Sequence, residues 1–260
     1  MRARGFTLIE LIVAITISAI VMVFAAMFIG APLGAYETHS RRAALVADTS
    51  GAWPRMETDL RAALPGSLRA RRNGNVVVVE MLPVLGVARY KTSPSAVSFT
   101  TAGTYTGVTP DYLSVNPDAN VYAVSGSMAA ASNFSAAAGA IAGEQVINVN
   151  PAPAFGPDSP KRSIYYVSRP VTYLCDEGTG TLRRYSNYTI AANPAARDTA
   201  AELNAAGAAS ALITQGLTAC NFQVSTASST QSQTAAVRLT TTRNGDVVTL
   251  LHSSHAEYVP

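Results

Sequence analysis

The sequence is poor in charge and in cysteine. Charged residues make up 13% of its 260 residues, about half the share of a typical soluble protein. This scarcity argues against a cytosolic enzyme and against an acidic disordered tail. The chain has 2 cysteines, too few for a small disulfide-rich scaffold or for a zinc site built from thiolates alone. A large core remains possible, because 48% of the residues are hydrophobic.

A strong excess of positive charge is also missing. The formal net charge is +3, from 19 Lys and Arg against 16 Asp and Glu. Arg2 and Arg4 supply two of these positive charges. Without them the excess of positive charge falls to about +1, which is too small to indicate a nucleic-acid-binding protein.

The motifs of common catalytic centres are absent too. The sequence contains no G-x-S-x-G turn, no glycine-rich phosphate loop and no H-E-x-x-H helix. His252 and His255 lie close to Glu257, but the preceding residues are predicted as a strand, which would place the two histidines on opposite faces. We expect no enzyme activity, no cofactor and no metal site.

One apolar segment dominates the N-terminus. From Phe6 to Ala35 the only ionisable side chain is Glu10, and Leu11–Ala31 is free of charge. This length is enough to cross a hydrocarbon layer of about 30 Å as a helix. Because basic residues precede it, the N-terminus should stay in the cytoplasm and the chain after about Gly34 should lie across the membrane.

Two simpler interpretations of this segment remain open. A secretory signal peptide has an apolar stretch of about 7–15 residues, shorter than this one. A plain uncleaved anchor explains the length but not Glu10, because a charged side chain inside an apolar helix costs about 2.5–3.5 kcal/mol on insertion scales. We therefore interpret Glu10 as a functional residue.

Residues 5–10 read Gly-Phe-Thr-Leu-Ile-Glu, after a short basic leader and before the apolar helix. This arrangement resembles the processing signature of type IV prepilins and type II secretion pseudopilins. The resemblance implies that prepilin peptidase cuts after Gly5, that the amine of Phe6 is methylated, and that Glu10 sets the register between subunits. The new amine of one subunit could meet Glu10 of its neighbour, a contact that is strong in low dielectric when both partners are present.

We expect four segments: a leader over residues 1–5, a transmembrane and assembly helix over 6–35, its amphipathic extension over 36–65, and an extracytoplasmic β-rich domain over 66–260. The predicted fold class is α+β, with the long N-terminal helix packed on an antiparallel β-sheet domain.

The amphipathic extension carries an apolar stripe at helical spacing. Its members are Trp53, Met56, Leu60 and Leu64, and we expect them to pack against a sheet. Pro54 predicts a break near 50–54 with Ser50 as the cap of the restarted helix. Pro65-Gly66 predicts the end of the helix.

Short β-like runs follow residue 66. We predict strands over Val76–Met81, Ala96–Thr101, Ser163–Val167, Val171–Cys175, Thr181–Tyr185, Asn221–Ser225, Ala235–Thr241 and Asp246–Leu251. Asn244-Gly245 predicts a two-residue hairpin turn.

Three other segments interrupt this pattern. Arg169-Pro170 indicates a bulge or an edge. Residues 102–160 have weak periodicity and are predicted to form a long irregular insertion. Thr199–Ile213 is predicted as a second helix, with Thr199 and Glu202 as a capping box.

Two basic clusters follow the apolar segment. Arg41-Arg42 and Arg69–Arg72 are expected to be solvated or to contact neighbouring subunits or lipid head groups.

Cys175 and Cys220 would face an oxidising compartment if the predicted topology holds, which favours a disulfide. Closing a loop of about 45 residues would contribute roughly 4 kcal/mol on the chain-entropy model. Two free buried thiols are the alternative.

Further segments resemble minor pilin-like components of the mannose-sensitive haemagglutinin (MSHA) type IV pilus. They are Asp59–Arg69, Tyr173–Tyr185 and Thr249–Pro260. The resemblance implies a structural inner-membrane subunit that is a substrate of prepilin peptidase and that joins other minor pilins, the major pilin and the inner-membrane assembly platform. It would initiate, cap or tune a filament.

Two alternatives stay open at this point. One is a minor pseudopilin of a type II secretion system, similar to GspJ, because both systems use the same N-terminal signature. The other is a membrane-tethered periplasmic enzyme or binding domain whose N-terminus only resembles a prepilin.

Overall fold

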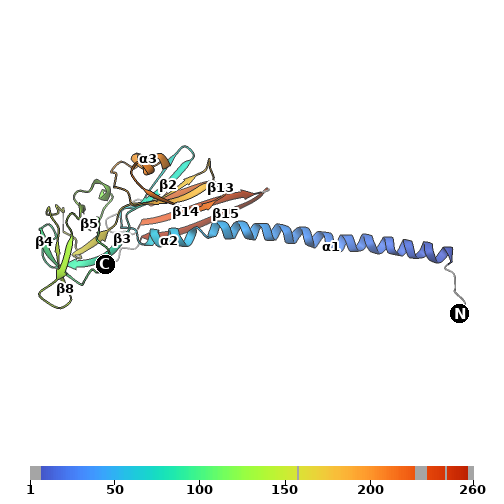
Figure 1. The fold of residues 1–260 in the computed structure, drawn as a ribbon, viewed down its shortest axis with the longest axis horizontal. Helices are drawn as coiled ribbons and strands as arrows, with labels where there is room; N and C mark the ends of the chain where they lie inside the picture. The colour runs from blue at the N-terminus through green and yellow to red at the C-terminus, as the bar shows by residue number, and fades with distance from the viewer. Residues whose placement is uncertain (1–6, 157, 226–232, 244, 257–260) are drawn as a thin grey trace. The chain divides into compact units, whose positions relative to one another are not determined.

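The computed structural model describes residues 7–156, 158–225, 233–243 and 245–256. The chain forms two compact units, residues 1–47 and 48–260. A long helix, α1 (Leu8–Ser50), forms the first unit and contributes its last residues to the second. Antiparallel sheets build most of the second unit (Figure 1). The predicted α+β class is confirmed.

The N-terminal half of α1 is apolar and uncovered. Within the described residues, Leu8–Phe28 is the one stretch long and apolar enough to cross a membrane, and its 21 residues match a hydrocarbon layer of about 30 Å. Every side chain from Leu8 to Phe28 is exposed. Among the residues that the structure describes, no side chain of this span is buried, which is consistent with a membrane anchor.

A second helix, α2 (Trp53–Arg61), follows after two residues, with Pro54 in its first turn. Pro fits there because the first N–H groups of a helix have no intrahelical partner. The residue at the cap is Ala52, so the prediction of Ser50 as the cap was wrong.

The helix also ends before Pro65-Gly66. Residues 62–64 instead pair with residues 82–84: Leu64 N donates to Leu82 O at 2.7 Å, and Val84 N donates to Ala62 O at 2.7 Å. These bonds replace the helical ones, so tertiary pairing sets the end of α2.

The described part of the second unit contains three antiparallel sheets. The five-stranded sheet has the order β1 (Arg69–Asn73), β2 (Val76–Met81), β10 (Val171–Asp176), β11 (Thr181–Ser186) and β12 (Ala209–Gln215). The three-stranded sheet has the order β13 (Leu217–Val224), β14 (Gln233–Arg243) and β15 (Asp246–Ala256). The seven-stranded sheet has the order β6 (Met128–Ala130), β5 (Tyr112–Val115), β9 (Ser163–Val167), β3 (Val84–Tyr90), β4 (Ser98–Ala102), β8 (Glu144–Asn148) and β7 (Ser135–Ala138).

The five- and three-stranded sheets share one core with α2. Met56 and Leu60 of α2 are fully buried there against Val79, Tyr173 and Val237. The predicted stripe of the amphipathic extension therefore packs on sheet, as expected. Leu64 lies beyond the helix and belongs to a separate apolar cluster with Leu82 and Tyr165.

A buried carboxylate fixes α2 to the five-stranded sheet. Asp59 is a charged residue of α2, yet it is only 9% exposed. Its Oδ2 accepts hydrogen bonds from Tyr173 Oη at 2.7 Å and from Arg184 Nε at 2.6 Å. Burial of this carboxylate is tolerated because it is both paired and hydrogen-bonded.

The prediction of an irregular insertion over 102–160 was wrong. This segment supplies β5, β6, β7 and β8 to the seven-stranded sheet, which has its own core. Ile147 of β8 lies opposite Phe99 of β4, and both are buried. Of these strands, β6 and β7 are rich in Ala and carry little local β-propensity, so pairing with the neighbouring strands β5 and β8 decides their structure.

The predicted second helix is much shorter than Thr199–Ile213. Its capping box is confirmed, since Thr199 and Glu202 bond reciprocally at the start of α3 (Ala200–Ala205). Gly207 then adopts a positive φ of 77°, which favours glycine and ends the helix. Leu212 and Ile213 lie on β12 instead.

The remaining predicted strands are present. Most shift by one or two residues at their ends, but β13 begins four residues earlier than predicted and β15 ends five residues later. Asn244 lies outside the described residues, and β14 and β15 pair up to Arg243 and Asp246 on either side of the predicted turn. Arg169-Pro170 is neither a bulge nor an edge, because β9 and β10 on its two sides belong to different sheets.

The arginines of β1 form ion pairs within the chain, and Arg71 and Arg72 stay exposed, as the prediction of a solvated cluster expected. Arg69 pairs with Glu80 at 2.6 Å, Arg71 with Asp198 at 2.5 Å and Arg72 with Glu177 at 2.8 Å. Burial raises the pKa of Glu80, and the guanidinium of Arg69 opposes that rise.

We predict that Leu60→Ala lowers the free energy of unfolding by about 2–5 kcal/mol, because it opens a cavity in the shared core. Glu57→Ala, at a half-buried position of α2 that pairs with Arg61 four residues on, should lower it by about 0.5 kcal/mol or less. Chemical denaturation of the full chain in detergent, followed by circular dichroism, measures both. Equal effects of the two substitutions would contradict the assigned face.

Candidate functional site

Glu10 lies in the first turn of α1, where it forms a capping box with Thr7. Glu10 Oε2 accepts hydrogen bonds from Thr7 N at 3.1 Å and from Thr7 Oγ1 at 2.9 Å. In return Glu10 N donates to Thr7 Oγ1 at 3.3 Å. The box satisfies N–H groups that the helix start leaves without partners. The Thr7-x-x-Glu10 spacing could have predicted it.

The capping box leaves the carboxylate without a counter-charge in the described part of the chain, where both hydrogen bonds that it accepts come from Thr7. Its immediate surroundings on the helix are the exposed apolar side chains of Leu8, Ile9 and Leu11. In lipid or in a helix bundle, this anion would gain most from a cation at the same depth. Gly5 and Phe6, the predicted processing site, lie outside the described residues.

Comparison with protein families identifies the N-terminus. Residues 1–26 match the family model of the prokaryotic N-terminal methylation motif. The chain has a prepilin-type N-terminus. No curated protein and no solved structure matches the chain.

The prepilin-type N-terminus supports a type IV pilin-like or pseudopilin protein, and with it processing by prepilin peptidase and association with a membrane. It favours a structural role over a catalytic one. The match ends at residue 26, within the apolar segment of α1, so it says nothing about the β-rich unit.

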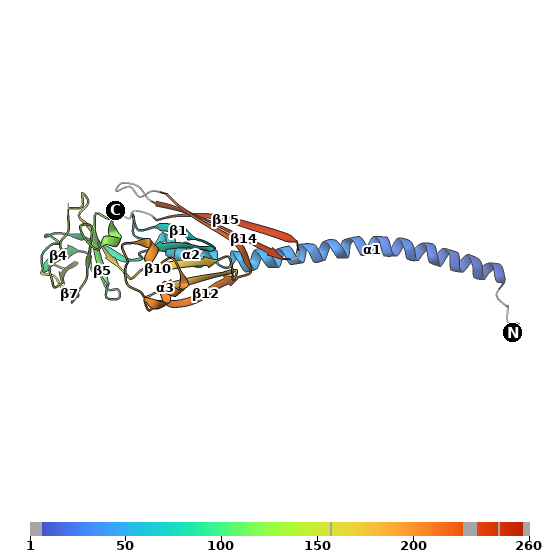
Figure 2. The ribbon, with the colours of Figure 1, turned by 90° about the horizontal axis from the view of Figure 1, so that it is seen from above.

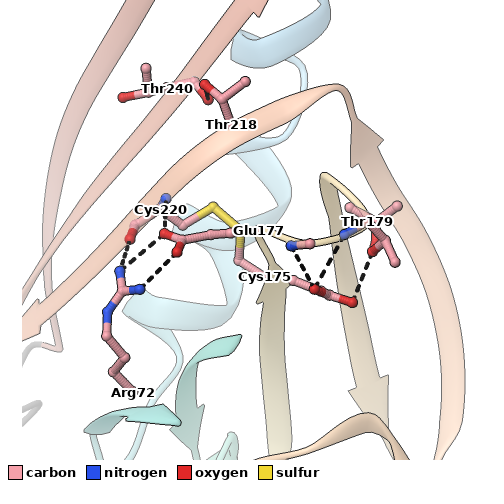
Figure 3. Close-up of a disulfide and its surroundings, with 10 residues drawn as sticks. Arg72, Cys175, Glu177, Thr179, Thr218, Cys220 and Thr240 are labelled. Atoms are coloured by element: carbon pink, nitrogen blue, oxygen red, sulfur yellow. Dashed lines mark hydrogen bonds and ion pairs between the residues drawn. A yellow bond between two sulfur atoms is a disulfide. The ribbon is translucent and has the colours of Figure 1, made fainter. Parts of the chain in front are cut away.

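The two cysteines form a disulfide between sheets (Figure 3). Cys175 lies on β10 of the five-stranded sheet and Cys220 on β13 of the three-stranded sheet, with their Cα atoms 6.4 Å apart. Both side chains are buried. Cross-linking residues 45 apart in sequence contributes roughly 4 kcal/mol on the chain-entropy model.

A charged pair surrounds the backbone of Cys220 (Figure 3). Glu177 Oε1 accepts a hydrogen bond from Cys220 N at 2.9 Å, and Arg72 Nη2 donates one to Cys220 O at 2.7 Å. Glu177 and Arg72 are themselves bidentate, at 2.8 and 3.0 Å. The hydrogen bond from Arg72 lowers the pKa of Glu177. The pair thus joins β1, the β10–β11 turn and β13 beside the disulfide.

The two histidines do not come together. His252 stacks on Trp53 with ring centroids 4.5 Å apart, while His255 occupies the other face of β15, as the strand alternation predicts. Glu257 lies outside the described residues. Among the residues that the structure describes, no group of three or more His, Cys, Asp or Glu side chains could hold a metal ion.

We predict that Glu177→Gln lowers the free energy of unfolding by about 1 kcal/mol at neutral pH, a value reduced for the partial exposure of the pair. The pKa of Glu177 is lower in the folded chain than its ordinary 4.5. Its stabilising contribution is therefore complete above the unfolded pKa and is lost as pH falls through the folded pKa. Denaturation of both chains between pH 7 and pH 3 should show their difference shrinking below about pH 4.5; a difference independent of pH would contradict the ionic role.

Proposed function

We propose that this chain is a structural, minor pilin-like subunit that takes part in the assembly of a type IV pilus. One observation carries the proposal: a lone carboxylate at position 10 stands in an exposed apolar helix, directly after a prepilin-type processing sequence. A helix that only anchors the chain in a membrane does not need the Glu10 carboxylate, which makes insertion less favourable. At an interface between subunits, the carboxylate could pair with an amine of the neighbouring subunit.

The proposed mechanism begins with cleavage. Prepilin peptidase would cut after Gly5 and N-methylate Phe6, creating a cationic amine about one helical turn before Glu10. Between neighbouring subunits, that amine would replace Thr7 as the main partner of the carboxylate. Because the contact lies in low dielectric, a register that pairs the charges is strongly favoured over one that leaves them apart.

The β-rich unit would lie on the periplasmic side of the inner membrane, and in the filament or at its tip after assembly. Support comes from the basic residues before the apolar run and from the disulfide, which persists in an oxidising compartment. Its proposed partners are other minor pilins, the major pilin and the inner-membrane assembly platform.

At a finer level we propose a subunit of the MSHA type, similar to the minor pilin-like protein MshO. Support for this comes from the sequence segments around Asp59–Arg69 and Tyr173–Tyr185. A minor pseudopilin of a type II secretion system would share the same N-terminus, so co-purification with pili rather than with secretion machinery discriminates the two. A membrane-tethered enzyme would require neither processing nor Glu10.

Processing gives the first test of this proposal. Co-expression with a prepilin peptidase should yield a chain whose intact mass lacks residues 1–5 and carries one added methyl group. An inactive peptidase serves as the control and should leave the full chain. An unprocessed chain in both samples would contradict the proposal.

Glu10 gives the second test. Glu10→Val should preserve membrane insertion, because it removes a charge from the apolar helix, yet reduce incorporation into filaments at least about tenfold, since the partner amine is left unpaired. Thr7→Val is the matched control, because it removes the capping box but keeps the carboxylate. Quantitative immunoblotting of sheared filaments measures both. Equal losses would mean that Glu10 acts as a helix cap and not as an assembly charge.

A further inference from the structure

Cys220 lies on a different sheet from its disulfide partner. Cys175 is on β10 of the five-stranded sheet, and Cys220 is on β13, at the end of the three-stranded sheet. The two sheets lie beside each other in the second unit (Figure 1, Figure 2). Within the described residues they share no β-ladder, so other contacts between β13 and the five-stranded sheet must decide where the sulfur of Cys220 lies.

One ion pair holds both backbone groups of Cys220 (Figure 3). Cys220 N donates to Glu177 Oε1 at 2.9 Å, and Arg72 Nη2 donates to Cys220 O at 2.7 Å. We call this pair the Arg72–Glu177 clamp. Its bonds go to the backbone of Cys220 and not to the sulfur. The same donors and acceptors are therefore present whether Cys220 is a free thiol or half of a disulfide.

The clamp is anchored to the sheet that carries Cys175. Glu177 follows Cys175 in the turn after β10, and Glu177 N donates to Asn75 O, in the β1–β2 turn, at 2.9 Å. The carboxylate of Asp176 stiffens the same turn, because its Oδ2 accepts a hydrogen bond from Thr179 Oγ1 at 2.9 Å. The arginine of the clamp lies on β1, which is joined to β10 through β2. Both halves of the clamp thus belong to the platform from which Cys175 projects.

The disulfide itself is shielded from solvent. The residues Cys175 and Cys220 are 0% and 3% exposed. Thiol–disulfide exchange requires a thiolate to attack one of the sulfurs, so a soluble thiol reaches this bond only when β13 moves away from the five-stranded sheet. The clamp opposes that movement, together with a hydrogen bond from Leu217 N to Gly180 O at 3.0 Å.

We propose that Arg72 and Glu177 are positioning residues for the oxidation of Cys175 and Cys220, and that they protect the disulfide once it has formed. In the dithiol form the clamp holds the two thiols together and so raises their effective concentration. The inference goes beyond the proposed function, because it concerns the second unit and not the N-terminal helix.

The oxidant in this reaction is a soluble or protein disulfide. One cysteine thiolate attacks the oxidant, forms a mixed disulfide and releases one thiol. The thiolate of the other cysteine then attacks the mixed disulfide and releases the second thiol. Two electrons and two protons pass from the two cysteines to the oxidant, which leaves as two thiols.

Equilibration of the full chain with glutathione, in detergent, tests the positioning role. Mixtures of reduced and oxidised glutathione set the ratio of dithiol to disulfide, alkylation traps the free thiols, and intact mass gives the oxidised fraction. The effective concentration of the two thiols follows from that fraction. Glu177→Ala and Arg72→Ala should each lower it about fivefold, because each removes a charge-assisted hydrogen bond to Cys220.

Arg71→Ala is the matched control. Arg71 is the neighbour of Arg72 on β1, forms an ion pair with Asp198 at 2.5 Å, and its side chain is 44% exposed against 48% for Arg72. Its loss should change the effective concentration by less than about twofold, because instability shared by the dithiol and disulfide forms cancels from the comparison. Equal falls in all three variants, or no fall in either clamp variant, would overturn the proposal.

Reduction of the folded, oxidised chain tests the protective role, and it remains valid if a dithiol variant fails to fold. With dithiothreitol in excess, the disulfide should be reduced about fivefold faster in Glu177→Ala and in Arg72→Ala, since β13 opens more readily without the clamp. Arg71→Ala should be reduced at the rate of the unsubstituted chain. Rates in both clamp variants equal to that of Arg71→Ala would contradict protection by the clamp.

Discussion

The apolar surface of α1 is the constraint on which the rest of the account depends. A span of 21 residues has all its side chains exposed within the described part of the structure. Burial of apolar surface is the main driving force of assembly, so this helix is stable only in lipid or among other helices. Glu10 places one charge at the start of this apolar segment, and a charge is costly wherever water is excluded unless it has a partner.

The second unit is held together by several separate connections. Its two smaller sheets share a core with α2, and each connection is reinforced by polar groups. Asp59 holds α2 to β10 and β11. The disulfide, with Glu177 and Arg72 around Cys220, holds β13 to the five-stranded sheet.

Local patterns in the sequence predicted much of this structure. Val76–Met81, the capping box at Thr199 and the position of Pro54 follow from local propensity and steric rules. The prediction for residues 102–160 was wrong because their strands take their structure from pairing with other strands, as Ile147 of β8 pairs with Phe99 of β4. The helix over 199–213 was too long because Gly207 ends it and β11 recruits the residues beyond. At the candidate site, Glu10 was predicted to be functional because a charged side chain is costly in an apolar helix. Its hydrogen bonds to Thr7 were not predicted, although the Thr7-x-x-Glu10 spacing is that of a capping box.

The central claim is that Glu10 of one subunit meets the N-terminal amine of another. Solid-state NMR on filaments assembled from two populations of the chain tests it directly, with ¹⁵N-labelled phenylalanine in one population and ¹³C-labelled glutamate in the other. The account predicts an intermolecular correlation between the Phe6 nitrogen and the Glu10 carboxyl carbon, at an ion-pair separation of about 4 Å. Filaments that contain both populations but lack this correlation would contradict it.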